Sequence, residues 1–468
     1  MSLTLLSATL LACIHPTPPG PTPAELAAEV PTPIAQSAPG ETVYVAAAVR
    51  AGSAHDPVGA EGTAWLTARH LRHGGTADLG PEAFEDALEA LGATLTLSVD
   101  KELVSLRGSA PAEHGEAFVA MVGALLATPG FAPEALTAEA PDDDAPSDDT
   151  LAAEALDIWL NQGHPYGRPV VGRADVRSVA DADTTAAFYA DRYTREAVTV
   201  GFAAPPSQQD SVALALGEPL AALSAAPYDA FLAIHPGLPT ARELLAIDAG
   251  AGSAAIALGA AVALPPEHPD RVALDLACLA LSAWDPGDGP PLQAGLDARL
   301  QPTLTVTLAP ASDDTSAQNA AFTLRRALRL LEEWPGVDEA RLADALERYG
   351  SAAAAAMPDD AIARAVRREA LELPTAGAGL LAAQALTPEQ INQALAAYLP
   401  LDRLRAVAVV EDAPAFLDLL FEENETLPVY SGPMPDNDRI DTDADTASWP
   451  LGIPPARAHV ADVEGVFQ

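Results

Sequence analysis

The residues best suited to metal chemistry lie in one short stretch near the start of the chain. His70 and His73 stand three positions apart in a predicted helix at residues 61–73. Histidines at this spacing share a helix face and can share a metal ion. His55 lies nearby in the sequence, but no acidic residue follows on the right face and Arg72 lies between the two histidines. Solvated or partly buried histidines are therefore the competing interpretation.

A second chemically suggestive stretch is residues 141–149, which holds five aspartates and two prolines. Carboxylates bind Ca²⁺, but the spacing and the glycine of an EF-hand loop are missing here. The stretch therefore favours a solvated loop.

The chain has two cysteines, which excludes a disulfide framework and a four-thiolate zinc site. Cys278 lies in an apolar, helix-periodic segment, which predicts a buried and inert thiol. The sequence contains no G-x-S-x-G elbow, P-loop or dinucleotide-binding fingerprint.

Two similar runs of predicted elements position these residues. The first half has strands at 43–49, 93–99, 103–107 and 197–203, and helices at 61–73, 81–91, 112–127, 151–160 and 183–193. The second half has strands at 253–264, 303–309 and 404–410, and helices at 268–284, 315–334, 338–356, 359–371 and 387–398. Each half ends in a helix, a short turn and a strand. This order indicates an α+β fold in which a mainly antiparallel sheet packs against helices in each half.

Composition divides the chain further. We expect a signal and lipobox at 1–13, a Pro-rich linker at 14–39, an N-terminal domain at 40–204, a linker at 205–245, a C-terminal domain at 246–430 and an acidic tail at 431–468.

The first thirteen residues suggest where the protein works. Residues 1–12 are apolar but too short to span a bilayer. Leu10-Leu11-Ala12-Cys13 resembles a bacterial lipobox, in which the cysteine is lipidated. We therefore expect a lipid anchor at Cys13 on the periplasmic face of the cell envelope, with the Pro-rich linker as a spacer.

The overall charge excludes one class of partner. The 468 residues carry a formal net charge of −41, and Lys101 is the only lysine. Nucleic-acid binding needs clustered Lys and Arg, so the chain is not a general nucleic-acid binder. The hydrophobic content of 49% is ample for packed cores.

Ordered landmarks follow the first strand and recur farther along. They are Gly52-Ser53, Asp56-Pro57-x-Gly59-x-x-Gly62, Gly75-Thr76, Gly92-Ala93, His164-Pro165-Tyr166-Gly167, Gly172, Phe188-Tyr189 and Tyr193. Together they resemble the pitrilysin/insulinase zinc metallopeptidases, which include the mitochondrial processing peptidase. The resemblance covers roughly residues 40–430 and implies two homologous metallopeptidase-like halves.

The resemblance also implies a zinc motif, H-x-x-E-H, on the helix after Gly62. In this alignment Trp65 and Arg69 stand at the two histidines and Ala68 at the glutamate. Indole has no lone pair for a metal, alanine is no base, and protonated arginine repels Zn²⁺. The family's third ligand, a glutamate, would fall in the stretch 141–149, where no glutamate stands. No intact catalytic residue and no bound cofactor are therefore expected.

The family also uses an Arg and a Tyr in its second half to hold substrate. Arg299 echoes that arginine, whereas the tyrosine is absent from residues 292–306. Arg299 is thus a weak substrate-binding candidate, with a plain surface arginine as the alternative.

Three functions remain open. The first is a non-catalytic member of the family, the partner or substrate-binding subunit of an active zinc peptidase, acting on peptide or unfolded protein. The second is an active zinc endopeptidase with displaced ligands, for which His70 and His73 are weak candidates and zinc would be the cofactor. The third is a membrane-tethered binding or scaffold protein.

Overall fold

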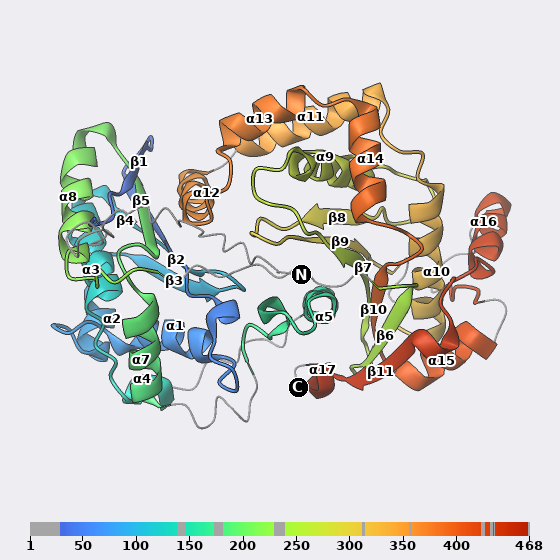
Figure 1. Ribbon diagram of the computed structural model, residues 1–468, viewed down its shortest axis with the longest axis horizontal. Helices are drawn as coiled ribbons and strands as arrows, with labels where there is room; N and C mark the ends of the chain where they lie inside the picture. The colour runs from blue at the N-terminus through green and yellow to red at the C-terminus, as the bar shows by residue number, and fades with distance from the viewer. Residues whose placement is uncertain are drawn as a thin grey trace, which may run out of the picture.

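Two sheets, each accompanied by helices, make up the molecule (Figure 1). The computed structural model describes residues 29–137, 147–172, 181–228, 239–310, 314–354, 357–422, 426–430, 434 and 436–466. The α+β prediction with two halves is confirmed. Cys13 and most of the stretch 141–149 lie outside the described residues.

The first sheet has five strands in the order β1-β5-β2-β4-β3. They are β1 (Ile34–Ser37), β2 (Thr42–Val49), β3 (Thr94–Val99), β4 (Val104–Pro111) and β5 (Val198–Ala204). Only the β1–β5 pair among these is parallel. The helices of this half are α1 (Thr63–Gly74), α2 (Pro81–Ala90), α3 (Gly115–Ala127), α4 (Glu134–Thr137), α5 (Asp148–Leu160), α7 (Ala182–Arg192) and α8 (Gln209–Leu220).

The second sheet has six strands in the order β11-β6-β10-β7-β9-β8. They are β6 (Glu243–Asp248), β7 (Ala254–Ala261), β8 (Gln293–Leu296), β9 (Thr303–Leu308), β10 (Arg405–Val410) and β11 (Ala458–Asp462). The helices are α9 (Pro269–Ala283), α10 (Ala317–Glu333), α11 (Glu339–Ala354), α12 (Pro358–Ala370), α13 (Ala376–Gln384), α14 (Pro388–Tyr398), α15 (Ala413–Glu422), α16 (Asn437–Ala447) and α17 (Val463–Val466). Thr387 and Gln390 form the predicted capping box at the start of α14.

Strand β2 is apolar at almost every position because both faces of its sheet are covered. Side chains alternate across a strand. Val43, Val45 and Val49 pack with the helices of the first half. Ala46 and Ala48 face the other way, against Ile362 and Val366 of α12. Helix α12 belongs to the second half in sequence, yet it covers the inner face of the first sheet (Figure 1).

In the same way, a helix of the first half, α5, covers the inner face of the second sheet, so the two halves exchange one helix each. Leu151, Leu156 and Leu160 of α5 pack against β7 and β10 on its inner face. A glycine lies beneath each exchanged helix: a Cβ on Gly201 would lie 2.8 Å from Ile362 Cδ1, and one on Gly259 would lie 3.2 Å from Leu156 Cδ2. Each sheet is therefore completed by a helix from the other half.

Three segments contribute more to the fold than the sequence suggested. β1 lies in the predicted Pro-rich linker and pairs with β5. Helix α8 lies in the predicted 205–245 linker, where Val212, Leu216 and Leu220 form a buried stripe that the surrounding Ala, Pro and Ser obscured. β11 lies in the predicted acidic tail and extends the second sheet beside β6.

Among the described helices, none is both long and apolar enough to cross a membrane.

Candidate functional site

Helix α1, which carries the predicted motif positions, is fixed at its start by a buried carboxylate. Asp56 is 3% exposed and accepts hydrogen bonds from the backbone N–H groups of Gly62 (2.6 Å) and Ala64 (2.7 Å). These are N–H groups that a helix start leaves without partners in the helix. Burial raises the pKa of Asp56 to about 7 despite these two bonds. The Asp56…Gly62 landmark thus orients α1.

The face of α1 at the predicted motif carries a stacked pair and a core alanine. The guanidinium carbon of Arg69 lies 4.7 Å from the ring centroid of Trp65, which is a cation–π geometry. Ala68 is 3% exposed and belongs to the first core. Neither an indole ring nor a guanidinium can give electrons to a metal.

His70 is a core residue with both ring nitrogens engaged. Its Nδ1 lies 2.7 Å from Thr185 Oγ1 and its Nε2 lies 2.8 Å from the carbonyl oxygen of Ala132. Its ring meets Phe131 edge-on with centroids 5.0 Å apart, and it is fully buried. Metal binding through either nitrogen would require the hydrogen bond of that nitrogen to be broken.

His73 lies one turn away beside positive charge. Burial, then Arg72 and Arg69, lower its pKa. Within the described ranges no three His, Cys, Asp or Glu side chains come together as a metal site. The side chains present on α1 therefore do not fit zinc.

Two further histidines of the first half, His55 and His164, act in the local structure. His55, in the short helix η1 (Ser53–His55), has its Nε2 2.7 Å from the hydroxyl of Tyr228. His164 caps the turn η3 (Pro165–Gly167), where its Nδ1 accepts a hydrogen bond from the Tyr166 N–H at 3.1 Å.

The tip of the β3–β4 hairpin carries buried charged residues at the junction of the halves. It contains Lys101, which is 1% exposed. The Nζ of Lys101 lies 3.9 Å from Oδ2 of Asp157 on α5. Next to it, Asp100 pairs with Arg367 of α12 at 2.5 Å. The hairpin tip therefore contacts both exchanged helices.

Arg299 lies in this junction. Its Nη1 lies 2.9 Å from Asp157 Oδ2, and its Nε lies 3.3 Å from Asp297 Oδ2. Burial disfavours its charged form, but Asp297 and Asp157 outweigh burial and raise its pKa. Arg299, the candidate substrate-binding residue of the sequence, thus forms ion pairs with carboxylates from both halves of the chain.

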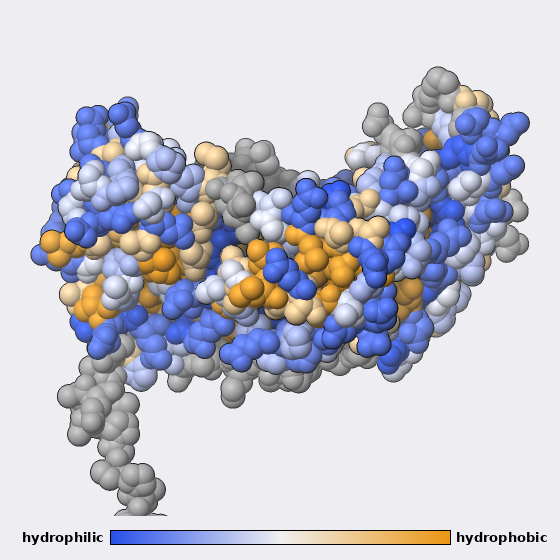
Figure 2. All heavy atoms as spheres, turned by 90° about the horizontal axis from the view of Figure 1, so that it is seen from above, coloured by the Kyte–Doolittle hydropathy of each residue, from blue (hydrophilic) through white to orange (hydrophobic). Residues whose placement is uncertain are grey.

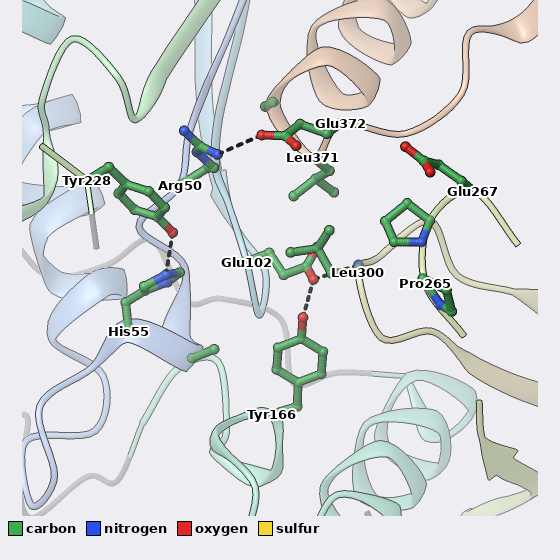
Figure 3. Close-up of a pocket in the computed structure, with 13 residues that line it drawn as sticks. Arg50, His55, Glu102, Tyr166, Tyr228, Pro265, Glu267, Leu300, Leu371 and Glu372 are labelled. Carbon is green, nitrogen blue, oxygen red and sulfur yellow. Dashed lines mark hydrogen bonds and ion pairs between the residues drawn. The ribbon is translucent and has the colours of Figure 1, made fainter. Parts of the chain in front are cut away.

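Glu102 is the third residue of the hairpin tip (Figure 3). Its Oε1 accepts hydrogen bonds from the Tyr166 hydroxyl and from the Leu300 N–H, the latter at 2.7 Å. Burial raises its pKa to about 7. Glu102 and Asp157 were not among the candidate residues inferred from the sequence. The available signals were the sole lysine beside Glu102 and an aspartate in the largely apolar run of α5.

Cys278 is 4% exposed, and burial raises the pKa of its thiol to about 12. This agrees with the inert core thiol expected from the sequence.

Residues 33–171 match the sequence model of the insulinase family, peptidase family M16. No curated protein sequence gives a significant match to the chain.

Solved structures of the same fold come from several bacteria. The inactive domain of a peptidase M16 from Pseudomonas fluorescens is 19% identical, with a TM-score of 0.68 over 80% of this chain and 94% of that one. A protease from Helicobacter pylori is 13% identical, with a TM-score of 0.63 over 80% and 96%. The periplasmic protease PqqL from Escherichia coli is 15% identical, with a TM-score of 0.61 over 86% of this chain and 50% of PqqL. At such identities the likeness concerns the fold.

Proposed function

We propose that this chain is a non-catalytic member of the insulinase family, peptidase family M16, whose sequence model matches residues 33–171. In this proposal it binds no zinc, pairs with an active zinc peptidase of the same family, and binds peptide or unfolded protein. The observation that carries the proposal is the face of α1, where Trp65 and Arg69 stack and Ala68 is buried. A metal-bound water and a general base both need side chains that this face does not offer.

An exposed apolar helix supports the partner role. Figure 2 shows hydrophobic side chains gathered in the middle of the upper face, where α13 lies in Figure 1. Helix α13 has the sequence AGAGLLAAQ, without a charged residue, and Leu381 on it is 72% exposed. Contiguous exposed apolar surface often marks a protein interface. The partner subunit would cover it.

Capture of the native protein from its source tests the partner role. We expect the wild-type chain to recover a relative with an intact H-x-x-E-H motif. A Leu381→Glu variant should recover much less of it, because a charge on α13 opposes burial in an interface. Leu214→Glu is the matched control, since Leu214 on α8 is 70% exposed on the other half. Recovery of the chain alone, or equal loss with both variants, would contradict the proposal.

The cellular location is part of the same proposal. We place the protein in the cell envelope, anchored through a lipid on Cys13 and held off the membrane by the Pro-rich segment. The lipobox-like Leu10-Leu11-Ala12-Cys13 supports this. Cys13→Ser should move the protein from the membrane fraction to the supernatant. Unchanged fractionation would remove the anchor from the proposal.

A further inference from the structure

A cavity of about 360 Å³ lies where the two halves meet (Figure 3). Arg50, His55, Glu102, Tyr166 and Tyr228 line it from one side, and the loops after β7, β8 and α12 line it from the other. Its volume lies in the range of small-molecule sites in proteins. It is separate from the Trp65–Arg69 face of α1, because neither residue lines it.

The interior of the cavity holds a carboxylate, that of Glu102, with one oxygen that accepts no hydrogen bond. Glu102 is 3% exposed, and both hydrogen bonds of its carboxylate go to Oε1. Its Oε2 is buried and has no hydrogen-bond partner in the described part of the chain. A buried carboxylate oxygen without a partner is costly. A ligand that donates a hydrogen bond to Oε2 would remove that cost.

The walls and the mouth differ in chemistry. Pro265, Pro266, Leu300 and Leu371 give the cavity an apolar wall. The remaining acidic lining residues, Glu267 and Glu372, are exposed. A ligand that fits therefore combines an apolar body with positive charge.

The basic side chains that line the cavity do not outweigh its acidic residues. The side chain of Arg50 is bonded to the Glu196 carbonyl at 2.6 Å and lies 4.3 Å above the Tyr228 ring. Its Nη1 also lies 3.6 Å from Glu372 Oε1. Burial, with help from Arg192, lowers the pKa of His55 to about 4, so His55 is neutral at physiological pH. Among the lining residues, one cation thus stands beside three carboxyl groups, and Arg299 acts on Glu102 from outside the lining.

The backbone at Glu372 is strained. This residue has a φ of +53° directly after α12, where glycine is the favoured residue. The left-handed conformation is unfavourable for a residue with a Cβ. Strain of this kind often accompanies a binding role. Here it holds a carboxylate at the rim of the cavity.

We propose that the cavity binds a small organic ammonium ion with an apolar body, whose N–H groups reach Glu102 and whose charge is further balanced by Glu267 and Glu372. The apolar body packs against Pro265, Pro266 and Leu371. Such a ligand touches both halves, so its binding stabilises the folded chain. This site is independent of the partner role proposed above.

Calorimetric titration of the full chain with phenethylamine tests the site, and 2-phenylethanol is the neutral probe of similar shape. At pH 8 the amine is protonated, because alkylamines have pKa values of about 10, and Glu102, with a pKa of about 7, is ionised. We expect the amine to bind at least about tenfold more tightly than the alcohol and to raise the melting temperature.

Three variants locate the site. Glu102→Gln should weaken amine binding at least about tenfold, to the level of the alcohol. Glu372→Gly should weaken it severalfold without loss of melting temperature, because glycine relieves the strained φ. Glu369→Gln, on the last turn of α12 outside this cavity, is the matched control and should bind like the wild type. Equal affinity for amine and alcohol, no binding of either, or an unchanged affinity in Glu102→Gln would overturn the proposal.

Discussion

At the residue scale, Trp65, Ala68 and Arg69 stand on α1 at the positions of the zinc ligands and the general base, and none of them can fill those roles. The guanidinium of Arg69 stacks on the ring of Trp65, and Ala68 is part of a packed core. His70, the nearest histidine, uses both ring nitrogens for structure. A zinc site here would require new ligands and space in the core for them.

Restoring the motif should therefore fail. In a Trp65→His/Ala68→Glu/Arg69→His variant, the new glutamate replaces a side chain that is 3% exposed. We expect a loss of at least about 2 kcal/mol in unfolding free energy from the buried carboxylate and no zinc by elemental analysis. The double variant Trp65→His/Arg69→His is the control and should stay folded. Stoichiometric zinc in the triple variant would show that a third ligand is present after all.

Glu102 should make stability depend on pH. Its pKa is about 7 in the folded chain against an ordinary value of 4.5. As the pH rises, the folded state therefore keeps the Glu102 proton to a higher pH than the unfolded state does. The stabilisation is fully present below pH 4.5 and is lost as pH rises through 7. Between pH 5 and 8 the wild type should lose about 2 kcal/mol that Glu102→Gln does not lose. The titratable or charged groups that interact with this carboxyl are Tyr166, Asp100, Arg299, Arg271 and Tyr228.

Urea unfolding of both proteins at pH 5 and pH 8 measures that difference, with Glu369→Gln as the control. Parallel pH dependence in wild type and Glu102→Gln would show that the proton on Glu102 does not distinguish the folded from the unfolded state.

At the element scale, the exchanged helices α5 and α12 hold the halves together. Each covers the inner face of the other half's sheet, and a glycine in the underlying strand makes room for it. The hairpin tip at residues 100–102 then pairs with both helices.

Gly201→Ala should weaken the packing of α12 against the first sheet. The added Cβ would lie 2.8 Å from both Ile362 Cδ1 and Val366 Cγ2. We expect a loss of about 1–3 kcal/mol in the free energy of unfolding. Adding Ile362→Val removes one of the clashing methyl groups, so the double variant should lose less than the sum of the single losses. Gly377→Ala on α13 meets no atom within 4 Å and should be neutral or stabilising. Thermal or chemical unfolding that ranks the two glycine variants equally would contradict this account.

Much of this arrangement was readable from the sequence. The apolar run of β2, the hairpin around Asp100 and the capping box at Thr387 were all predicted correctly. Helix α8 was missed because its buried stripe lies among small residues and prolines. The exchange of α5 and α12 could not be predicted, since local periodicity shows which helix face is apolar but not which sheet it covers. For the same reason the pair Arg299–Asp157, 142 positions apart, was not foreseen.

At the scale of the whole molecule, the two halves depend on one another. Residues 29–228 alone would lack α12 and expose Ala46, Ala48 and Ala203 on a bare sheet. We expect this fragment to aggregate when produced alone and to become soluble when produced together with residues 239–468. Size-exclusion chromatography and circular dichroism measure this. A fragment that folds cooperatively alone would show that the exchanged helix is not needed.

We propose that this chain uses the fold of the insulinase-family peptidases without zinc chemistry. Zinc content and peptide cleavage, measured together on the purified chain after incubation with zinc, test this most directly. We predict less than about 0.1 zinc per chain and no chelator-sensitive cleavage of unfolded peptides, because Trp65, Ala68 and Arg69 offer zinc no ligand and both ring nitrogens of His70 are hydrogen-bonded. About one zinc per chain together with cleavage that a chelator abolishes would contradict the account.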